Sequence, residues 1–148
     1  MTVSNDCHFC KLANNYSAAH TIYECEDLIA FLDITPIRES HTQIVTKEHF
    51  EYFDDLPRVI SHKIIDLGQR IARAQKLMYP VERVAFLFTG GDINHVHAHV
   101  LPVYEKTDIT SLQYIKDKNV EFGNTPKISL EVLDAVTARL KSSLRDVA

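Results

Sequence analysis

Short apolar runs in the first hundred residues have the length and alternation of β-strands. These runs cover residues 21–24, 28–32, 41–46 and 84–88. Only three residues separate the first two runs, a link short enough for a hairpin. The run at 84–88 is apolar at every position, which predicts a strand buried on both faces.

Two longer stretches carry apolar residues at helical spacing instead. The first lies between Pro57, suited to a first helical turn, and Pro80, which ends the pattern. Its stripe consists of Val59, Ile60, Ile64, Leu67, Ile71, Ala74 and Met78. The second follows Ser129, a helix-capping residue type, and is predicted to be a last helix. Its stripe consists of Leu130, Leu133, Val136, Leu140 and Leu144. Both stripes are predicted to pack on a core, and His62 is predicted to face solvent.

Length and composition favour one ordinary globular domain spanning residues 1–148. The chain is 45% hydrophobic and 24% charged, with a formal net charge of −4. Its Lys and Arg residues are scattered, which gives no sign of nucleic-acid binding. No apolar run reaches the length of a membrane span, and the N-terminus lacks a signal-peptide pattern. Three cysteines argue against a disulfide framework, so we expect a reducing cytoplasm.

Three of the eight histidines alternate with small apolar residues, at positions 95, 97 and 99. In an extended strand, His95, His97 and His99 would share one face, with neighbours in the row roughly 6.6 Å apart. The ends of the row would then be roughly 13 Å apart, a strained span for one metal ion. We therefore expect the row to be divided between two functions.

Cys7 and Cys10 form a C-x-x-C pair near the N-terminus. Two thiolates at this spacing can hold one zinc ion in a tight turn if distant histidines complete the set. A redox pair and two plain buried thiols remain open on the spacing alone. His8, between the cysteines, is interpreted as a turn residue.

Several other polar residues are ambiguous when taken singly. Asp33 directly follows the run at 28–32, where a strand-terminating cap is the simplest interpretation. His41 and His49 flank the third run, and each alone is typical of a solvated or hydrogen-bonded histidine. Gly90 and Gly91 allow positive φ and close approach of a ligand, so they form either an amide-lined phosphate seat or a tight hairpin turn.

Taken together, these motifs resemble the signature of the histidine triad (HIT) superfamily, in the zinc-binding branch that has an N-terminal C-x-x-C. The three histidines are followed by Val100-Leu101-Pro102, as in that signature. Four more segments occur in the expected order and spacing: C-x-x-C-K at 7–11, IAFLDITP at 29–36, SHT at 40–42 and K-x-H at 47–49. The match covers roughly residues 7–104. Residues 105–148 form a C-terminal extension whose packing it does not define.

The resemblance implies an α+β fold with an antiparallel sheet of about five strands and one long helix, here with a C-terminal helix added. It also implies a homodimer that attacks the α-phosphate of a nucleotide conjugate. His97 would be the nucleophile and would form a nucleotidyl-histidine that water then cleaves. His99 and His41 would contact the phosphate and the leaving group. A neutral imidazole is a competent nucleophile near pH 7, so this step requires no metal.

The resemblance assigns binding residues as well. The nucleotide, expected to carry a purine, would contact Asp33, Ile34, Gly90, Gly91, His97 and His99, with Asp33 on the ribose hydroxyls. In the branch that keeps both cysteines, the zinc ligands would be Cys7, Cys10, His49 and His95. A Cys₂His₂ set has no open coordination position, so this zinc would be structural.

One stretch departs from the family pattern. Residues 89–94 read Thr-Gly-Gly-Asp-Ile-Asn, where many members carry an Ala-Gly-Gln-Ser-like sequence. Asp92 stands near the Ser position, and a carboxylate beside a phosphate repels it unless it is protonated, paired or turned away.

Three functional hypotheses follow from these residues. The first, which we favour, is a hydrolase or nucleotidyl transferase similar to nucleotide phosphoramidases and dinucleoside polyphosphate hydrolases. The second is a nucleotide-binding adaptor with little turnover, motivated by the altered stretch at 89–94. The third makes the histidine row a catalytic metal site.

Overall fold

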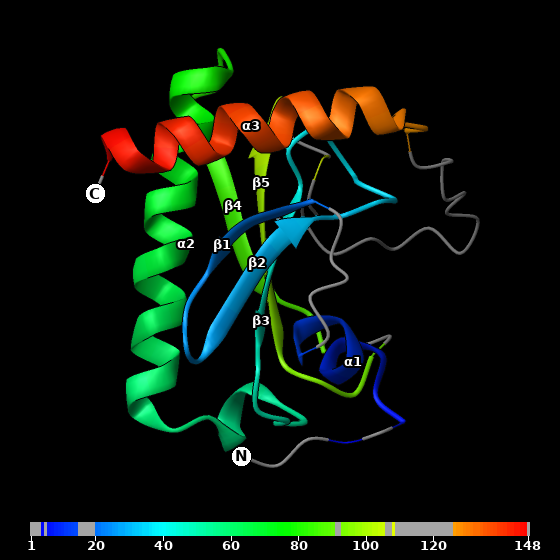
Figure 1. The fold of residues 1–148 in the computed structure, drawn as a ribbon. Coiled ribbons are helices and arrows are strands. Elements are labelled where there is room, and N and C mark those ends of the chain that lie inside the picture. The colour runs from blue at the N-terminus through cyan, green and yellow to red at the C-terminus, as the bar shows by residue number, and fades with distance from the viewer. Residues whose placement is uncertain are drawn as a thin grey trace, which may run out of the picture.

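The computed structural model describes residues 4, 6–14, 20–90, 93–105, 108 and 126–147. They form an α+β fold around a five-stranded antiparallel sheet with the order β1-β2-β3-β5-β4 (Figure 1). The strands are β1 (Thr21–Glu24), β2 (Leu28–Leu32), β3 (Thr42–Thr46), β4 (Arg83–Phe88) and β5 (His97–Val103). The predicted fold class is therefore confirmed.

Helices cover the two faces of this sheet unequally. The long helix α2 (Arg58–Met78) and the C-terminal helix α3 (Leu130–Asp146) pack on one face. The short helix α1 (His8–Asn14) covers only the lower part of the other face (Figure 1). A short 3₁₀ helix, η1 (Phe53–Asp55), links β3 to α2. Part of the second face is thus left open for a cavity.

Strand β2 is buried at all five positions because helices cover both of its faces. Successive side chains of a strand point to opposite faces. Leu28, Ala30 and Leu32 therefore join the core beneath α2 and α3, whereas Ile29 and Phe31 pack against α1. This second, smaller core holds α1 in place beside the histidines.

The helical stripes are confirmed except at their first residues. Ile64, Leu67 and Ile71 are buried in α2, but Val59 is exposed because it lies in the first turn, before the part of α2 that packs on the core. In α3, the residue predicted to begin the stripe, Leu130, is likewise exposed in the first turn.

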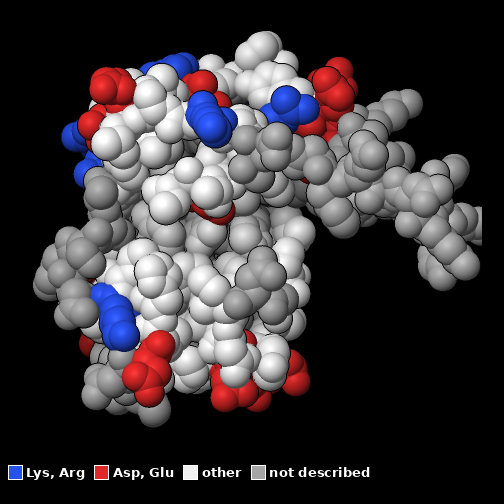
Figure 2. All heavy atoms as spheres, turned by 90° about the vertical axis from the view of Figure 1, so that its right-hand side faces the viewer, with Lys and Arg blue, Asp and Glu red and all other residues white. Residues whose placement is uncertain are grey.

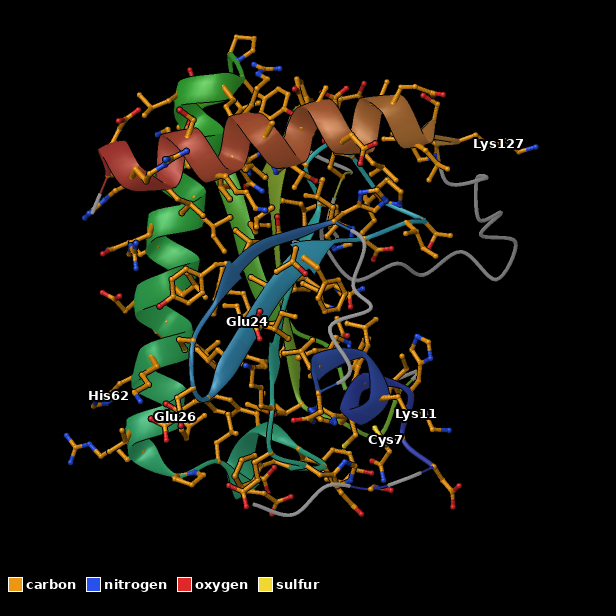
Figure 3. All side chains as sticks on the ribbon, in the orientation of Figure 1. Cys7, Lys11, Glu24, Glu26, His62 and Lys127 are labelled. Atoms are coloured by element: carbon orange, nitrogen blue, oxygen red, sulfur yellow. The ribbon has the colours of Figure 1, made fainter. Side chains whose placement is uncertain are left out.

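Two polar positions on the helices agree with the sequence prediction. Ser129 caps α3, because its hydroxyl accepts a hydrogen bond from the Val132 N–H at 3.4 Å. His62 lies on the outer side of α2, as predicted, and points away from the sheet (Figure 3).

Strand β4 corrects the prediction of a strand buried on both faces. Among the described residues it pairs only with β5 and forms one edge of the sheet, and none of its own residues is fully buried. Phe86 is the most exposed of its apolar side chains. A continuous apolar run has the same pattern in a central strand as in an edge strand with partly covered faces, so the sequence could not distinguish them.

No helix among the described residues is long and apolar enough to cross a membrane.

The packing of α3 generates a stability prediction. Leu140 is fully buried against the core, whereas Leu130, on the same helix, is 67% exposed. We expect Leu140→Ala to lower the free energy of unfolding by about 2 to 5 kcal/mol, because it leaves a cavity. Leu130→Ala should change it by less than about 0.5 kcal/mol. Urea unfolding of both variants measures the difference, and equal midpoints would show that α3 does not stabilise the core.

Candidate functional site

Two of the three histidines in the row lie on β5, between β3 and β4. His97 is paired with Val45 of β3, and His99 is paired with Gln43 of β3 and Leu87 of β4. His95 lies in the bend before the strand, so the predicted three-residue row on one strand is wrong. The bend places His95 in a cluster with Cys7, Cys10 and His49, apart from His97 and His99 on the strand. The division of the row between two functions stays a prediction.

The His97 ring is held in one tautomer by its own chain. Its Nδ1 lies 2.8 Å from the backbone carbonyl oxygen of His95. A carbonyl only accepts hydrogen bonds, so Nδ1 carries the hydrogen and Nε2 keeps a lone pair. The side chain is 6% exposed, and Phe9 packs edge-on against it at a ring-centroid distance of 5.0 Å.

His41 and His99 form a chain of directed hydrogen bonds. The Ile37 N–H donates to His41 Nδ1 at 3.2 Å, so the hydrogen of neutral His41 is on Nε2. His41 Nε2 lies 2.9 Å from His99 Nδ1 and donates to it. His99 Nε2 then carries a hydrogen, and it lies 3.2 Å from the hydroxyl oxygen of Thr89. Burial lowers the pKa of His41, although the nearby Asp33 carboxylate opposes this, so His41 is neutral at pH 7.

Asp33 follows β2 and is fixed by neighbours on two elements. One carboxylate oxygen accepts a hydrogen bond from the Thr35 N–H at 2.8 Å, and the other accepts one from Gln43 Nε2 at 2.7 Å. The second oxygen also lies 3.7 Å from His41 Nδ1. These bonds hold the carboxylate close to the histidines.

A cavity of about 660 Å³, hereafter the main cavity, lies over this group. Its polar walls are Asp33, Thr35, His41, Gln43, Thr89, His97, His99 and Asp108. Its volume is in the range typical of small-molecule sites. It opens on the face of the molecule that Figure 2 shows, where a hollow near the middle is mostly lined in white.

The remaining residues predicted to contact the nucleotide do not all lie at the main cavity. Ile34 is 71% exposed and does not line the main cavity. Gly90 has a φ of +62°, which favours glycine, and lines a neighbouring cavity of about 210 Å³, hereafter the side cavity. His97 and Thr89 border both cavities. Gly91 and Asp92 lie outside the described residues, as does most of the C-terminal extension before α3.

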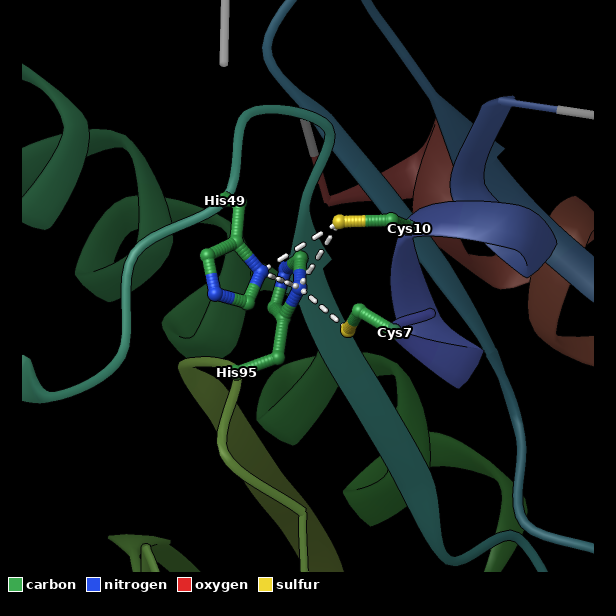
Figure 4. Close-up of side chains that lie close together, drawn as sticks. All are labelled: Cys7, Cys10, His49 and His95. Atoms are coloured by element: carbon green, nitrogen blue, oxygen red, sulfur yellow. Dashed lines mark hydrogen bonds between the residues drawn. The ribbon is translucent and has the colours of Figure 1, made fainter. Parts of the chain in front are cut away.

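The other predicted cluster brings together residues far apart in the sequence. One donor atom each of Cys7, Cys10, His49 and His95 lies within 4.8 Å of the others (Figure 4). His95 Nδ1 lies 3.3 Å from Cys7 Sγ, 3.5 Å from Cys10 Sγ and 3.2 Å from His49 Nδ1. Tetrahedral zinc with ordinary bond lengths requires donor separations of about 3.3 to 3.7 Å. The four residues therefore fit a metal ion.

The supporting contacts also suit a metal. His95 Nε2 donates to the Thr46 carbonyl oxygen at 2.9 Å, which leaves the Nδ1 lone pair directed at the thiols. Burial lowers the pKa of His95 to about 4, so this ring is neutral at pH 7. Burial raises the pKa of the Cys10 thiol, and a bound cation would favour its thiolate.

The cysteine pair lies at the start of a helix rather than in the tight turn predicted. Cys7 directly precedes α1, and Cys10 lies in its first turn. His8, interpreted as a turn residue, is the first residue of the helix. Asn14 fixes α1 to the loop that carries His49, because its side-chain amide donates to the carbonyl oxygens of Cys10 and Lys47.

A second group, Asp33, His41 and His99, also has donor atoms within 4.8 Å of one another. The hydrogen-bond chain already uses both nitrogens of His41, as acceptor from the Ile37 N–H and as donor to His99. This arrangement favours the histidines as proton donors and acceptors over the hypothesis of a catalytic metal.

Several contacting residues escaped the sequence analysis. Thr46 contributes through its backbone carbonyl, which no pattern reveals, and Asn14 and Thr89 stand singly in segments without periodicity. Gln43 could have been found, because in an extended strand it lies two residues from His41 and therefore on the same face.

Comparison with known families is consistent with this geometry. The family model described as "HIT domain" matches residues 14–106, more than half of the chain. The chain belongs to the HIT family. Relatives at similar length support this: an uncharacterized HIT-like protein of Methanocaldococcus jannaschii is 32% identical over 131 residues, covering 82% of this chain and 96% of the relative.

Two further relatives bear on chemistry and fold. The adenosine 5′-monophosphoramidase of Saccharomyces cerevisiae is 30% identical over 102 residues, covering 68% of this HIT chain and 65% of the yeast protein. The crystal structure of a zinc-bound histidine triad family protein from Mycobacterium smegmatis matches with a TM-score of 0.70 at 24% identity. That match covers 95% of this chain and 94% of the other, and it bears on the fold.

Proposed function

We propose that this HIT protein cleaves adenylated substrates at the α-phosphate, as a hydrolase or nucleotidyl transferase that works through His97. The observation that carries the proposal is the 2.8 Å hydrogen bond from His97 Nδ1 to the His95 carbonyl oxygen. It leaves Nε2 unprotonated on a ring that borders the main cavity, as a nucleophile requires.

The proposed reaction proceeds in two displacements. His97 Nε2 attacks the α-phosphorus and forms a P–N bond, while the bond from phosphorus to the leaving group breaks. The leaving group takes a proton, for which His99 Nε2–H is the donor, and His41 hydrogen-bonds to the opposite ring nitrogen of His99. Water then attacks the nucleotidyl-histidine, releases the nucleoside monophosphate and restores both histidines. A second alcohol or amine in place of water would give transfer.

The nucleotide is proposed to lie in the main cavity. Asp33 retains lone pairs for a ribose hydroxyl beside its bonds to Thr35 and Gln43. Ile34, Gly90 and Gly91 are assigned as further contacts by family resemblance, and the apolar part of the cavity would receive a purine. The candidate substrates are phosphoramidates and dinucleoside polyphosphates.

We also propose a structural zinc ion on Cys7, Cys10, His49 and His95. The donor set is closed, since it fills all four tetrahedral positions and leaves none for substrate. Bound zinc would join α1 to the loop after β3 and to the bend before β5. The zinc ion would thereby hold the His95 carbonyl, which orients His97.

The yeast relative favours hydrolysis, because its name states a phosphoramidase activity. The second candidate, a nucleotide-binding adaptor with little turnover, is favoured by the sequence at 89–94 alone. Two further features are proposed from the family resemblance and from the composition. They are a homodimer, supported by the half-buried apolar edge strand β4, and a cytoplasmic location, supported by three cysteines free of disulfides.

Hydrolysis of adenosine 5′-phosphoramidate tests the nucleophile. We expect the wild type to release AMP and His97→Ala to be slower by at least about a thousandfold, because removing a nucleophile costs that much or more. His62→Ala, which removes an exposed histidine of α2, should match the wild type. Rates are measured by chromatography of AMP.

Equal release by wild type and His97→Ala would remove His97 from its role. If the wild type cleaves neither the phosphoramidate nor diadenosine tetraphosphate but binds AMP, the adaptor hypothesis is correct instead.

Metal content tests the structural zinc. We expect one zinc per chain in the wild type, loss of zinc in Cys7→Ser, and a melting temperature lower by at least about 5 °C, because the metal stabilises the folded state. Cys25→Ser is the matched control, since Cys25 is another half-buried thiol and lies outside the cluster. Elemental analysis and calorimetry provide both readouts. Full zinc occupancy and an unchanged melting temperature in Cys7→Ser would contradict the proposal.

A further inference from the structure

The side cavity differs in chemistry from the main cavity that it adjoins. Its walls come from the loop at residues 51–54, from Phe88 at the end of β4, and from Gly90 and His97. The loop contributes two carboxylates, Glu51 and Asp54, and two aromatic rings, Tyr52 and Phe53. The side cavity is therefore both acidic and aromatic.

Its position beside the nucleophile gives it access to the reaction. His97 is 6% exposed and borders both cavities, and its Nε2 has no hydrogen-bond partner among the described residues. In an in-line displacement, the leaving atom departs on the side of the phosphorus opposite Nε2. The group attached to that atom can then extend across Thr89 and Gly90 into the side cavity.

The aromatic rings are held in place but left open to a ligand. Phe53 stacks on Phe88 at a ring-centroid distance of 4.7 Å, and the Tyr52 ring lies next to Gly90. Even so, Tyr52 is 47% exposed and Phe53 is 50% exposed. Exposed ring faces beside carboxylates attract an ammonium group through both cation–π and ion-pair interactions.

The charges of the described residues that line the cavities favour one of the two candidate substrate classes. No Lys or Arg is among the described residues that line either cavity. The middle of this face carries no blue side chain where grey atoms leave it visible (Figure 2). A polyphosphate leaving group would carry several negative charges toward Glu51 and Asp54, which repel it, and no described residue of the side cavity supplies a positive charge.

We propose that the side cavity receives the leaving group and selects a cationic amine. This inference rests on the proposed function. The substrates are then nucleoside 5′-phosphoramidates in which the amine bonded to phosphorus carries a second, positively charged ammonium group. The P–N bond of the substrate breaks as His97 Nε2 bonds to phosphorus, and the amine takes one proton and leaves. Glu51 and Asp54 contact only the distant ammonium group and act in specificity.

Three adenosine 5′-phosphoramidates that share one P–N bond and differ at the tail test the inference. They are made from 1,4-diaminobutane, 1-aminopentane and 5-aminopentanoate, and their tails end in an ammonium, a methyl and a carboxylate group. We expect kcat/KM to fall in that order, with the ammonium substrate at least about tenfold better than the carboxylate substrate. Unsubstituted adenosine 5′-phosphoramidate is measured in parallel.

The double variant Glu51→Gln/Asp54→Asn should lower the ratio of ammonium to carboxylate substrate by at least about threefold, because it removes both charges, keeps the shapes and leaves only the attraction of the aromatic rings. Glu82→Gln, which removes an exposed carboxylate outside both cavities, should keep the wild-type ratio. The ratio is taken within each variant, so a general loss of activity cancels.

A wild type that cleaves the unsubstituted phosphoramidate but treats the three tails alike would overturn the inference and leave the proposed function intact. A ratio of ammonium to carboxylate substrate that is unchanged in the double variant would also overturn it. A wild type that cleaves none of the four compounds would overturn the proposed function and, with it, the inference.

Discussion

Hydrogen bonds from imidazole rings to backbone carbonyl oxygens determine what His95 and His97 can do. His97 donates from Nδ1 to the His95 carbonyl, and His95 donates from Nε2 to the Thr46 carbonyl. The first bond leaves Nε2 of His97 free over the cavity, and the second leaves Nδ1 of His95 free toward two thiols. Two neighbouring histidines of one motif thus expose opposite ring nitrogens to different partners.

The sheet makes this division possible. Strand β5 runs between β3 and β4. Its backbone is paired with both neighbours at His99 and with β3 at His97, which fixes the position of both residues. The bend at His95 lies just outside that ladder and can turn toward α1. Zinc at the cysteine cluster would fix this bend, which supplies the carbonyl for His97. The proposed zinc would therefore support the chemistry without touching the substrate.

Sequence patterns predicted the strands and both long helices, because periodicity is a local property, whereas the members of the two clusters were assigned by resemblance to a family. The strand boundary at His95 could not be predicted, since alternation of histidines continues past the point where pairing begins. The edge position of β4 depends on strand order, which its apolar run does not encode. Resemblance to a family supplied the grouping of Cys7 with His95, which no spacing argument provides.

The role of the charged and aromatic loop at 51–54 likewise could not be predicted from the sequence. As sequence, it is a short polar link before a helix, and only the folded chain brings it beside His97. The same nucleophile beside a different neighbouring wall would let one reaction serve different leaving groups. The residues of that wall would determine the proposed amine preference. The backbone carbonyl that accepts the hydrogen bond of the histidine orients it for the proposed attack.

The most direct test of this account is the tautomer of His97. Long-range ¹H–¹⁵N correlation spectra of protein labelled with ¹⁵N-histidine report which ring nitrogen carries the hydrogen, and the loss of one pattern in His97→Ala assigns it. The account predicts hydrogen on Nδ1 of His97 at neutral pH, opposite to His95, which carries it on Nε2. Hydrogen on Nε2 of His97 would contradict it, because the attacking nitrogen would have no lone pair.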